Sequence, residues 1–307
     1  MRTVYLGTSD FAATVLRRLS TSAHKPALVV TRPARPKGRG RTLQDPPVAD
    51  ASRALAIEVF QPESVNEPDA VERISALKPE ALVVCAFGAI VKQPLLSMVT
   101  NFNVHPSLLP RWRGAAPIER AIAAGDAETG VTIMRLVEEL DAGPVCEQQP
   151  VTINPDDNYG SISPRLAELG GELLVRALDS AAAGDVHWTD QSEMGGEEAV
   201  TYAEKIVKED RVLQPRSSSA LELEQMIRAL TPHIGAMFET DGDPLRVEAA
   251  RAVVDVVEPG TAIELDGRLL VGTADHSLEL LSVKPAGKQA MDAASYLRGN
   301  GPPILKG

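Results

Sequence analysis

The chain opens with the stretch TVYLGTSDF at Thr3–Phe11, in which strand-forming residues lead into a glycine and a short polar turn. Apolar residues at helical spacing follow as far as Leu19, and Ser9 is a suitable N-cap. A second apolar run at 25–31 completes a βαβ unit. The turn lacks the GxGxxG spacing of a dinucleotide site, so we do not expect a nicotinamide cofactor.

The same alternation continues through the first half of the chain. Helical patterns at 48–55 and 69–77 alternate with strand-like runs at 57–60 and 81–86. This order predicts an α/β fold with a doubly wound, mostly parallel sheet. Such sheets bind ligands beyond the carboxyl ends of their strands. We therefore expect the segments that follow strand ends to meet there, namely Gly7, Gly88 and 103–110.

After a long helical pattern at 159–183 the alternation stops. A polar segment, one helical pattern at 219–230 and several short apolar runs separated by Gly, Asp and Pro turns follow. Short strands at close turn spacing predict a small, OB-like β-barrel. We place an N-terminal domain at 1–188, a linker at 189–205 and a C-terminal β-barrel domain at 206–307.

The charge is unevenly distributed. The net charge is −11, which disfavours indiscriminate nucleic-acid binding. From Phe11 to Gln44, however, there are basic residues and no acidic ones, and many of the basic residues lie in a Pro- and Gly-rich loop at 32–45. A solvated linker is one interpretation. We favour a loop that contacts the phosphates of a nucleic acid, because long loops within a βαβ pattern usually carry function.

The composition indicates the class of protein and its cellular location. Hydrophobic residues make up 44% of it, enough for a buried core, yet no apolar run reaches the roughly 18 residues that span a bilayer. Cys85 and Cys146 lie far apart without a CxxC motif, so neither a disulfide framework nor a zinc site is indicated. The N-terminus lacks the pattern of a signal peptide. We expect a cytoplasmic protein with no membrane association and, most simply, a monomer.

Three polar residues form a candidate reaction centre. Asn103 and His105 face the same side if the chain is extended there. Asp141 lies in an acidic turn, where Gly143 allows close backbone approach. An amide that donates to an oxyanion, with a histidine held by a carboxylate, suits acyl transfer through a tetrahedral intermediate. Because no Ser or Cys sits in a nucleophile elbow, the acceptor itself would attack. The alternative is that Asn103 caps a turn, His105 is a loop histidine and the acids are solvated.

Several motifs carry a family resemblance. NVHPSLLP at 103–110, together with LDAGP around Asp141, resembles the signature of the 10-formyltetrahydrofolate-dependent formyltransferases. RWRGAAPI at 111–118 is similar to the branch that acts on aminoacyl-tRNA rather than on a ribonucleotide. GTSDFA near the start, TYAEK at 201–205 and PAGKQAM at 285–291 extend the resemblance over nearly the full chain.

The resemblance implies a reaction and a set of site residues. The formyl donor would be 10-formyltetrahydrofolate, the acceptor the α-amine of initiator methionyl-tRNA, and Asn103, His105 and Asp141 the catalytic residues. Folate contacts are expected from Ser107, Leu108, Leu109, Pro110, Phe87, Gly88, Ile90, Val137 and Leu140. Contacts to tRNA are expected from Arg35, Lys37, Arg39, Arg41, Arg111, Arg113, Lys205 and Lys288, although the last two equally suit surface salt bridges. No metal is expected, because the histidines and carboxylates lack ligand spacing.

The sequence departs from the family motifs at two positions, and two alternative functions stay open. Phe87 stands where many members of the family carry tyrosine, and Pro106 replaces a common glycine, which leaves the details of folate contact open. A formyltransferase for a small amine would keep the chemistry but would need neither the basic loop nor the barrel. A non-catalytic tRNA-binding protein would explain those two features but would leave Asn103, His105 and Asp141 without a role.

Overall fold

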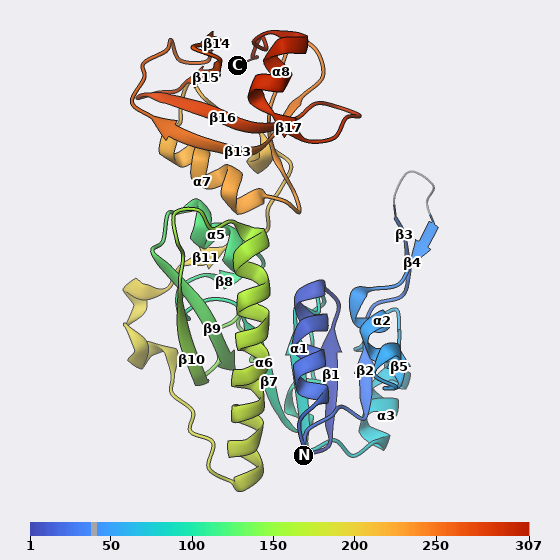
Figure 1. Cartoon of the computed structure of the whole chain (residues 1–307). Coiled ribbons are helices and arrows are strands. Elements are labelled where there is room, and N and C mark those ends of the chain that lie inside the picture. The colour runs from blue at the N-terminus through green and yellow to red at the C-terminus, as the bar shows by residue number, and fades with distance from the viewer. Residues whose placement is uncertain (38–41, 307) are drawn as a thin grey trace. The chain divides into compact units, whose positions relative to one another are not determined.

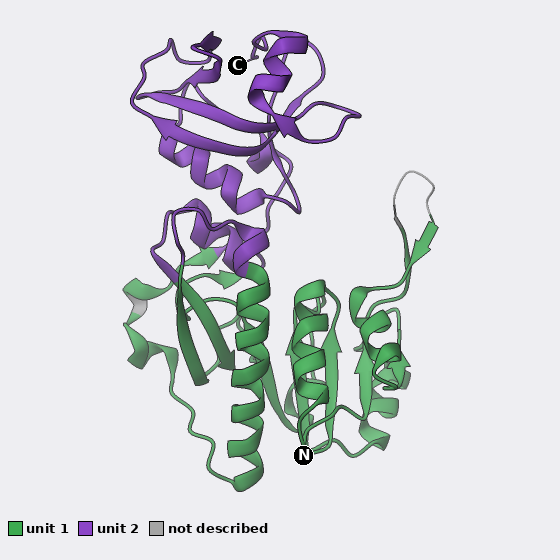
Figure 2. Cartoon of the chain, in the orientation of Figure 1, with its two compact units in different colours: residues 1–114, 129–152, 163–202 green, residues 115–128, 153–162, 203–307 purple. Residues whose placement is uncertain are grey.

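The computed structural model describes residues 1–37 and 42–306 of the chain. These residues form two compact units (Figure 2). Unit 1 contains 1–114, 129–152 and 163–202, and unit 2 contains 115–128, 153–162 and 203–307. Two short segments from the first half of the chain therefore group with the C-terminal residues. The domain boundaries at 188 and 205 stay a prediction. Among the described residues, no helix combines the length and apolar character needed to cross a bilayer.

A seven-stranded sheet forms the centre of unit 1 (Figure 1). Its strand order is β10-β9-β7-β6-β1-β2-β5. The pairs from β7 through β5 are parallel, whereas β9 runs antiparallel to β7. The expected doubly wound, mostly parallel sheet is thereby confirmed. Its strands are β1 (Thr3–Gly7), β2 (Leu28–Val30), β5 (Val59–Phe60), β6 (Ala81–Cys85), β7 (Thr100–His105), β9 (Glu128–Met134) and β10 (Val145–Thr152).

Helices cover both faces of this sheet. Val4, Leu82 and Ile74 belong to one buried cluster, which places α3 on the face that carries the even-numbered residues of β1. Tyr5 points the other way, and its hydroxyl donates to the carbonyl of Ala12 in α1 at 2.6 Å. The helices formed by residues before 184 are α1 (Asp10–Ser20), α2 (Pro47–Ala54), α3 (Pro68–Ala76), α4 (Leu95–Met98), α5 (Pro117–Ala123) and α6 (Tyr159–Ala183).

The switch point of the sheet lies between β1 and β6. The chain runs outward from β1 to β2 and β5, and then crosses back to pair β6 with β1. The Thr8 hydroxyl donates to the Phe87 carbonyl at 2.8 Å, which ties the two strand ends together. A Cβ on Gly7 would lie 2.6 Å from the Tyr5 ring and 3.1 Å from the Cys85 carbonyl oxygen. Glycine is therefore required where the two strand ends come closest.

One expectation about position is wrong. Asn103 and His105 do not follow a strand but lie inside β7. Asn103 pairs with Val84 of β6 on one side and with Met134 of β9 on the other. The strand continues because its intervening residue, Val104, is buried and both neighbouring strands supply backbone partners. The two polar side chains still share one face of the strand, as their spacing predicted.

The basic loop also contains more structure than its composition indicated. At its base, β3 (Arg35–Lys37) and β4 (Thr42–Gln44) pair in antiparallel fashion. A second two-stranded pair joins β8 (Arg113–Gly114) to β11 (Tyr202–Ala203).

Unit 2 is built on a six-stranded antiparallel sheet packed against α7 (Ala220–Leu230). Ile227 of α7, Phe238 and Leu280 belong to its buried core. Ser219 and Glu222 form a capping box at the start of α7. The strands are β12 (Ala236–Phe238), β13 (Leu245–Val253), β14 (Ala262–Leu265), β15 (Arg268–Gly272), β16 (Ser277–Lys284) and β17 (Met291–Asp292), followed by α8 (Ala293–Asn300), which the sequence pattern did not indicate.

The cysteine environments lead to a first prediction. Burial raises the pKa of the Cys85 thiol to about 12, and burial together with the charge of Glu147 does the same for Cys146. Because only the thiolate is nucleophilic, we expect alkylation by iodoacetamide at pH 8 to be about a thousandfold slower in the folded protein than in urea. Peptide mass spectrometry after timed quenching measures this. Equal rates in the folded and unfolded protein at either cysteine would contradict it.

Candidate active site

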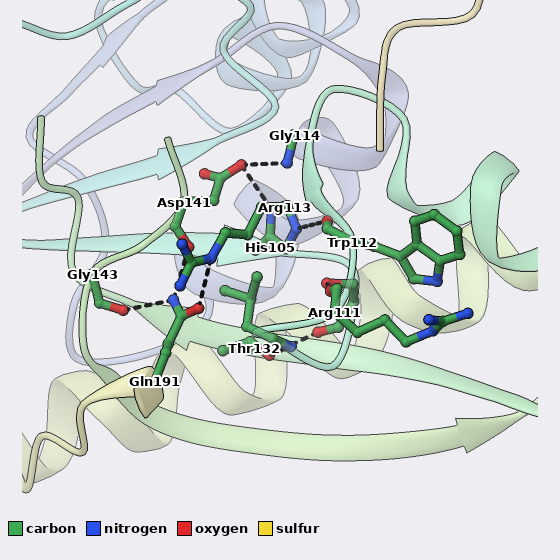
Figure 3. A network of polar contacts seen from close by, with 11 residues as sticks. His105, Arg111, Trp112, Arg113, Gly114, Thr132, Asp141, Gly143 and Gln191 are labelled. Carbon is green, nitrogen blue, oxygen red and sulfur yellow. Dashed lines mark hydrogen bonds and ion pairs between the residues drawn. The ribbon is translucent and has the colours of Figure 1, made fainter. Parts of the chain in front are cut away.

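The orientation of the His105 ring is fixed from one side. His105 ends β7 and is 4% exposed. Its Nε2 lies 2.9 Å from the carbonyl oxygen of Trp112 (Figure 3). A carbonyl only accepts, so Nε2 carries a proton and donates it to this bond. Nδ1 faces the Oδ2 atom of Asp141 at 3.7 Å. Nδ1 is therefore the ring nitrogen that can gain or lose a proton while the bond to Trp112 stays in place.

Asp141 reaches the histidine from the acidic turn that follows β9. Its Oδ2 accepts a hydrogen bond from the Gly114 backbone N–H at 2.9 Å. Its φ of 48° lies in the left-handed region, which aspartate tolerates better than most residues. The close approach expected at Gly143 is confirmed, because a Cβ there would lie 1.8 Å from the carbonyl oxygen of Arg135. The turn therefore packs against the chain just beyond β9 and aims the carboxylate at the His105 ring.

Asn103 lies two residues before His105 on the same face of β7 and is 8% exposed. Within the part of the chain that the structure describes, the side-chain amide of Asn103 makes no hydrogen bond to another protein group. The amide is therefore available to a bound ligand beside the His105 and Asp141 pair.

The loop after β7 is held by hydrogen bonds from side chains of β9 and β10. Thr132 of β9 donates to the Ser107 carbonyl at 2.7 Å and accepts from the Leu109 N–H at 3.2 Å. Gln148 of β10 donates to the same hydroxyl at 2.8 Å and to the Leu109 carbonyl at 2.9 Å. The Ser107 hydroxyl in turn donates to the Arg111 carbonyl. These bonds fix the predicted folate-lining loop at its backbone.

Not every predicted folate position exposes a side chain. Ser107 and Leu109 are buried, and Leu109 packs against Met134 and Val145. Pro110 is buried as well, while Leu108 is partly exposed. In this loop, therefore, only the backbone groups and the Leu108 side chain are available to contact a ligand.

The remaining predicted folate positions lie on two segments, one that follows β6 and one that follows β9. Ile90 and Leu140 are 75% and 59% exposed, and Val137 is 38% exposed. Their neighbours Val91 and Leu136 pack against one buried cluster, which also contains Phe87. Gly88, next to Phe87, has a φ of 75°. Exposed aliphatic side chains on adjoining segments suit the flat face of a ring system.

One predicted tRNA contact is placed differently from the expectation. Arg113 is 8% exposed, and its guanidinium donates to Gln191 at 3.0 Å and to Glu139 at 3.2 Å. It is held inside the unit because its hydrogen-bonding groups meet buried and turn residues there. Figure 3 shows it pointing toward the acidic turn, whereas Arg111 extends beside Trp112, 4.4 Å from the ring centroid.

The other predicted tRNA positions are mostly exposed. Arg35, Lys205 and Lys288 are exposed, and neither lysine pairs with an acid among the residues that the structure describes. Arg39, Arg41 and the side chain of Lys37 lie outside the described part of the chain.

Sequence patterns missed three groups that shape this site: Thr132, Gln148 and Gln191. Each acts through hydrogen bonds to residues distant in the chain, so no local spacing marks them. The only available signal was polarity in an apolar context, at Thr132 within the strand-like run GVTIM.

Comparisons with known proteins agree with this geometry. A family model described as formyl transferase matches residues 1–178, and one described as its C-terminal domain matches residues 205–301. The chain belongs to the formyl transferase family.

Relatives match over nearly the full length. The methionyl-tRNA formyltransferase of Methylococcus capsulatus is 41% identical, with 98% of this chain and 97% of the relative covered. That of Phenylobacterium zucineum is 42% identical, with 99% and 98% covered. Among solved structures, HypX from Aquifex aeolicus in complex with tetrahydrofolic acid has a TM-score of 0.65 at 18% identity, covering 97% of this chain and 47% of HypX. That likeness supports the fold.

The Thr132 hydroxyl yields a second prediction. Thr132→Val leaves the Leu109 N–H and the Ser107 carbonyl without their buried partner, which lowers the free energy of unfolding by about 1–3 kcal/mol. Urea denaturation measures the loss, and hydrogen exchange shows faster exchange of the Leu109 amide. Thr129→Val is the matched control, because its hydroxyl on the same strand is buried without a partner. An equal loss in both variants would contradict a specific role for Thr132.

Proposed function

We propose that this chain transfers the formyl group of 10-formyltetrahydrofolate to the α-amine of initiator methionyl-tRNA. The observation that carries the proposal is identity of 41–42% to methionyl-tRNA formyltransferases over nearly the whole of both chains. An N-formyltransferase of Helicobacter canadensis, solved in complex with folinic acid and dTDP-3-aminofucose, is 14% identical. The tRNA substrate is therefore favoured over a small amine.

The folate donor suits the segments of unit 1 that follow β6, β7 and β9. Exposed Ile90, Val137 and Leu140 offer apolar contact to the pterin ring, and the backbone of 107–110 is held rigid by Thr132. Phe87 supplies a ring without a hydroxyl, and it is 9% exposed. In this arrangement the formyl carbon would lie toward the Asn103 amide and the His105 and Asp141 pair.

The reaction begins with attack by the acceptor. The methionyl amine nitrogen forms a bond to the formyl carbon, and the carbonyl electron pair moves onto the formyl oxygen. Asn103 donates an N–H to this oxyanion, a contribution of the oxyanion-hole kind. His105, when protonated at both nitrogens, adds positive charge beside it. Because the acceptor is the nucleophile, no acyl-enzyme forms.

Collapse of the intermediate needs proton transfers. The amine nitrogen loses a proton, the bond between carbon and N10 breaks, and N10 takes the electron pair and a proton. Asp141 and Nδ1 of His105 face each other at 3.7 Å. With Nδ1 protonated, the Asp141 carboxylate accepts the amine proton; with Nδ1 unprotonated, His105 accepts it. The bond from Nε2 to Trp112 holds the ring in place throughout.

Contacts to tRNA are proposed from the exposed basic positions. Arg35 lies at the base of the basic loop, and Lys205 and Lys288 lie on unit 2. Basic side chains contact phosphates without selecting a sequence, so they position the tRNA rather than identify it. The loop bearing Arg39 would inspect the end of the acceptor stem.

Asn103 provides the test of the chemistry. Asn103→Ala and Asn103→Asp should lower kcat by about 10²–10³, because each removes the N–H donor from the oxyanion. Formylmethionine released from methionyl-tRNA in the presence of 10-formyltetrahydrofolate is the quantity to measure. Thr3→Val serves as control, since it removes a buried hydroxyl, bonded to the His24 carbonyl, at the opposite end of β1. Near-normal kcat in either Asn103 variant would exclude this role.

The basic loop provides the test of the acceptor. Arg39→Ala should raise KM for methionyl-tRNA, and this increase should shrink as salt rises, because a phosphate contact is screened. Binding of tetrahydrofolate, followed by fluorescence or calorimetry, should stay unchanged. Equal losses of tRNA use and folate binding would argue against the assignment.

A further inference from the structure

The acidic turn is held by a carboxamide that no motif marks. Gln191 begins the short 3-10 turn at Gln191–Met194 and is 3% exposed. Its Nε2 donates to the carbonyl of Asp141 at 2.7 Å and to that of Gly143 at 2.8 Å. Its Oε1 accepts from Nε of Arg113 at 3.0 Å. Both N–H donors and the oxygen of one side chain are thus used at the turn that carries Asp141 (Figure 3).

Arg113 closes the network from the other side. Its guanidinium binds Gln191 and the Glu139 carboxylate, while the next residue, Gly114, donates its backbone N–H to Asp141. The dipeptide 113–114 therefore holds the turn through the side chain of Glu139, through Gln191 and through the Asp141 carboxylate.

The turn needs such restraint. Residues 137–140 are exposed, and Asp141 itself adopts a left-handed φ of 48°. A non-glycine residue in this region keeps its conformation only where its surroundings impose it. The two hydrogen bonds from Gln191 fix the carbonyls of Asp141 and Gly143, on either side of residue 142. The Asp141 backbone is thereby fixed at the position from which its carboxylate meets both Gly114 and His105.

We propose that Gln191, held by Arg113, is a positioning residue that keeps the Asp141 carboxylate aligned with the Nδ1 atom of His105. The inference rests on the proposed function, in which Asp141 and His105 handle the amine proton. Gln191 touches neither substrate nor reacting atom in this role. It acts only through the turn.

The chemistry of the carboxamide defines the test variants. Gln191→Glu keeps the shape and the acceptor for Arg113 but cannot donate to the two carbonyls. Gln191→Met removes all three side-chain hydrogen bonds of Gln191 at similar side-chain volume. It replaces Gln191→Glu as the test variant if that variant does not fold. A displaced catalytic group costs about 10- to 100-fold in rate, so kcat should fall by that factor while KM for methionyl-tRNA stays within about threefold.

A double-mutant comparison separates positioning from mere structural support. If Gln191 acts through Asp141, adding Gln191→Glu to Asp141→Asn should lower kcat by less than about threefold more. If Gln191→Glu caused a general structural defect, it would lower kcat by the same factor in the Asp141→Asn background as in the wild type. Thr3→Val is the control for a lost buried hydrogen bond, and it should leave kcat per folded molecule unchanged. Thermal melting and tetrahydrofolate binding establish that each variant is folded.

The outcomes distinguish a failure of the Gln191 positioning role from a failure of the proposed function. Failure of the unaltered protein to form formylmethionine would overturn the proposed function. With an active protein and an impaired Asp141→Asn variant, a wild-type kcat for Gln191→Glu and Gln191→Met would overturn the positioning role. A loss that multiplies fully in the double variant would overturn it as well. The expected loss, absent in the Asp141→Asn background, supports it.

Discussion

The hydrogen bond from the Gly114 N–H to the Asp141 carboxylate is the contact on which the site depends. It joins residues 27 positions apart and sets the carboxylate 3.7 Å from His105. The segment on each side of it contains a residue in the left-handed region, Trp112 at 63° and Asp141 at 48°. These bends direct the Trp112 carbonyl and the Asp141 carboxylate to opposite nitrogens of one imidazole. The strain is local, and its effect is to fix the histidine from both sides.

The sheet supplies the fixed reference for these loops. β7 lies between β6 and β9, so Asn103 and His105 project from a strand with backbone partners on both sides. Groups carried on such a strand are placed more accurately than groups on a free loop. β9 contributes again through Thr132, which holds the loop after β7. Two neighbouring strands thus position the amide, the imidazole and the proposed folate-lining backbone together.

The sequence predicted those features that depend on burial or on local geometry. The alternation of apolar runs revealed the sheet, two-residue spacing placed Asn103 and His105 on one face, and Gly143 marked a close approach. Features that depend on distant partners stayed hidden. Arg113 was expected to contact tRNA, and only the fold shows Gln191 and Glu139 beside it. The sequence pattern likewise did not predict β7 (Thr100–His105), because its polar residues interrupt the apolar pattern and its hydrogen bonds come from β6 and β9.

The buried arginine explains why a neutral amide lies at the centre of the network. A guanidinium placed directly on the Asp141 carboxylate would compete with the His105 ring for the same negative charge. Instead, Arg113 pairs with the Glu139 carboxylate. It also donates to Gln191, which in turn donates to the backbone carbonyls of Asp141 and Gly143. The positive charge is balanced by a carboxylate outside the reaction centre. The Asp141 carboxylate is thereby left to the Gly114 N–H and to His105, whose Nδ1 lies 3.7 Å from its Oδ2.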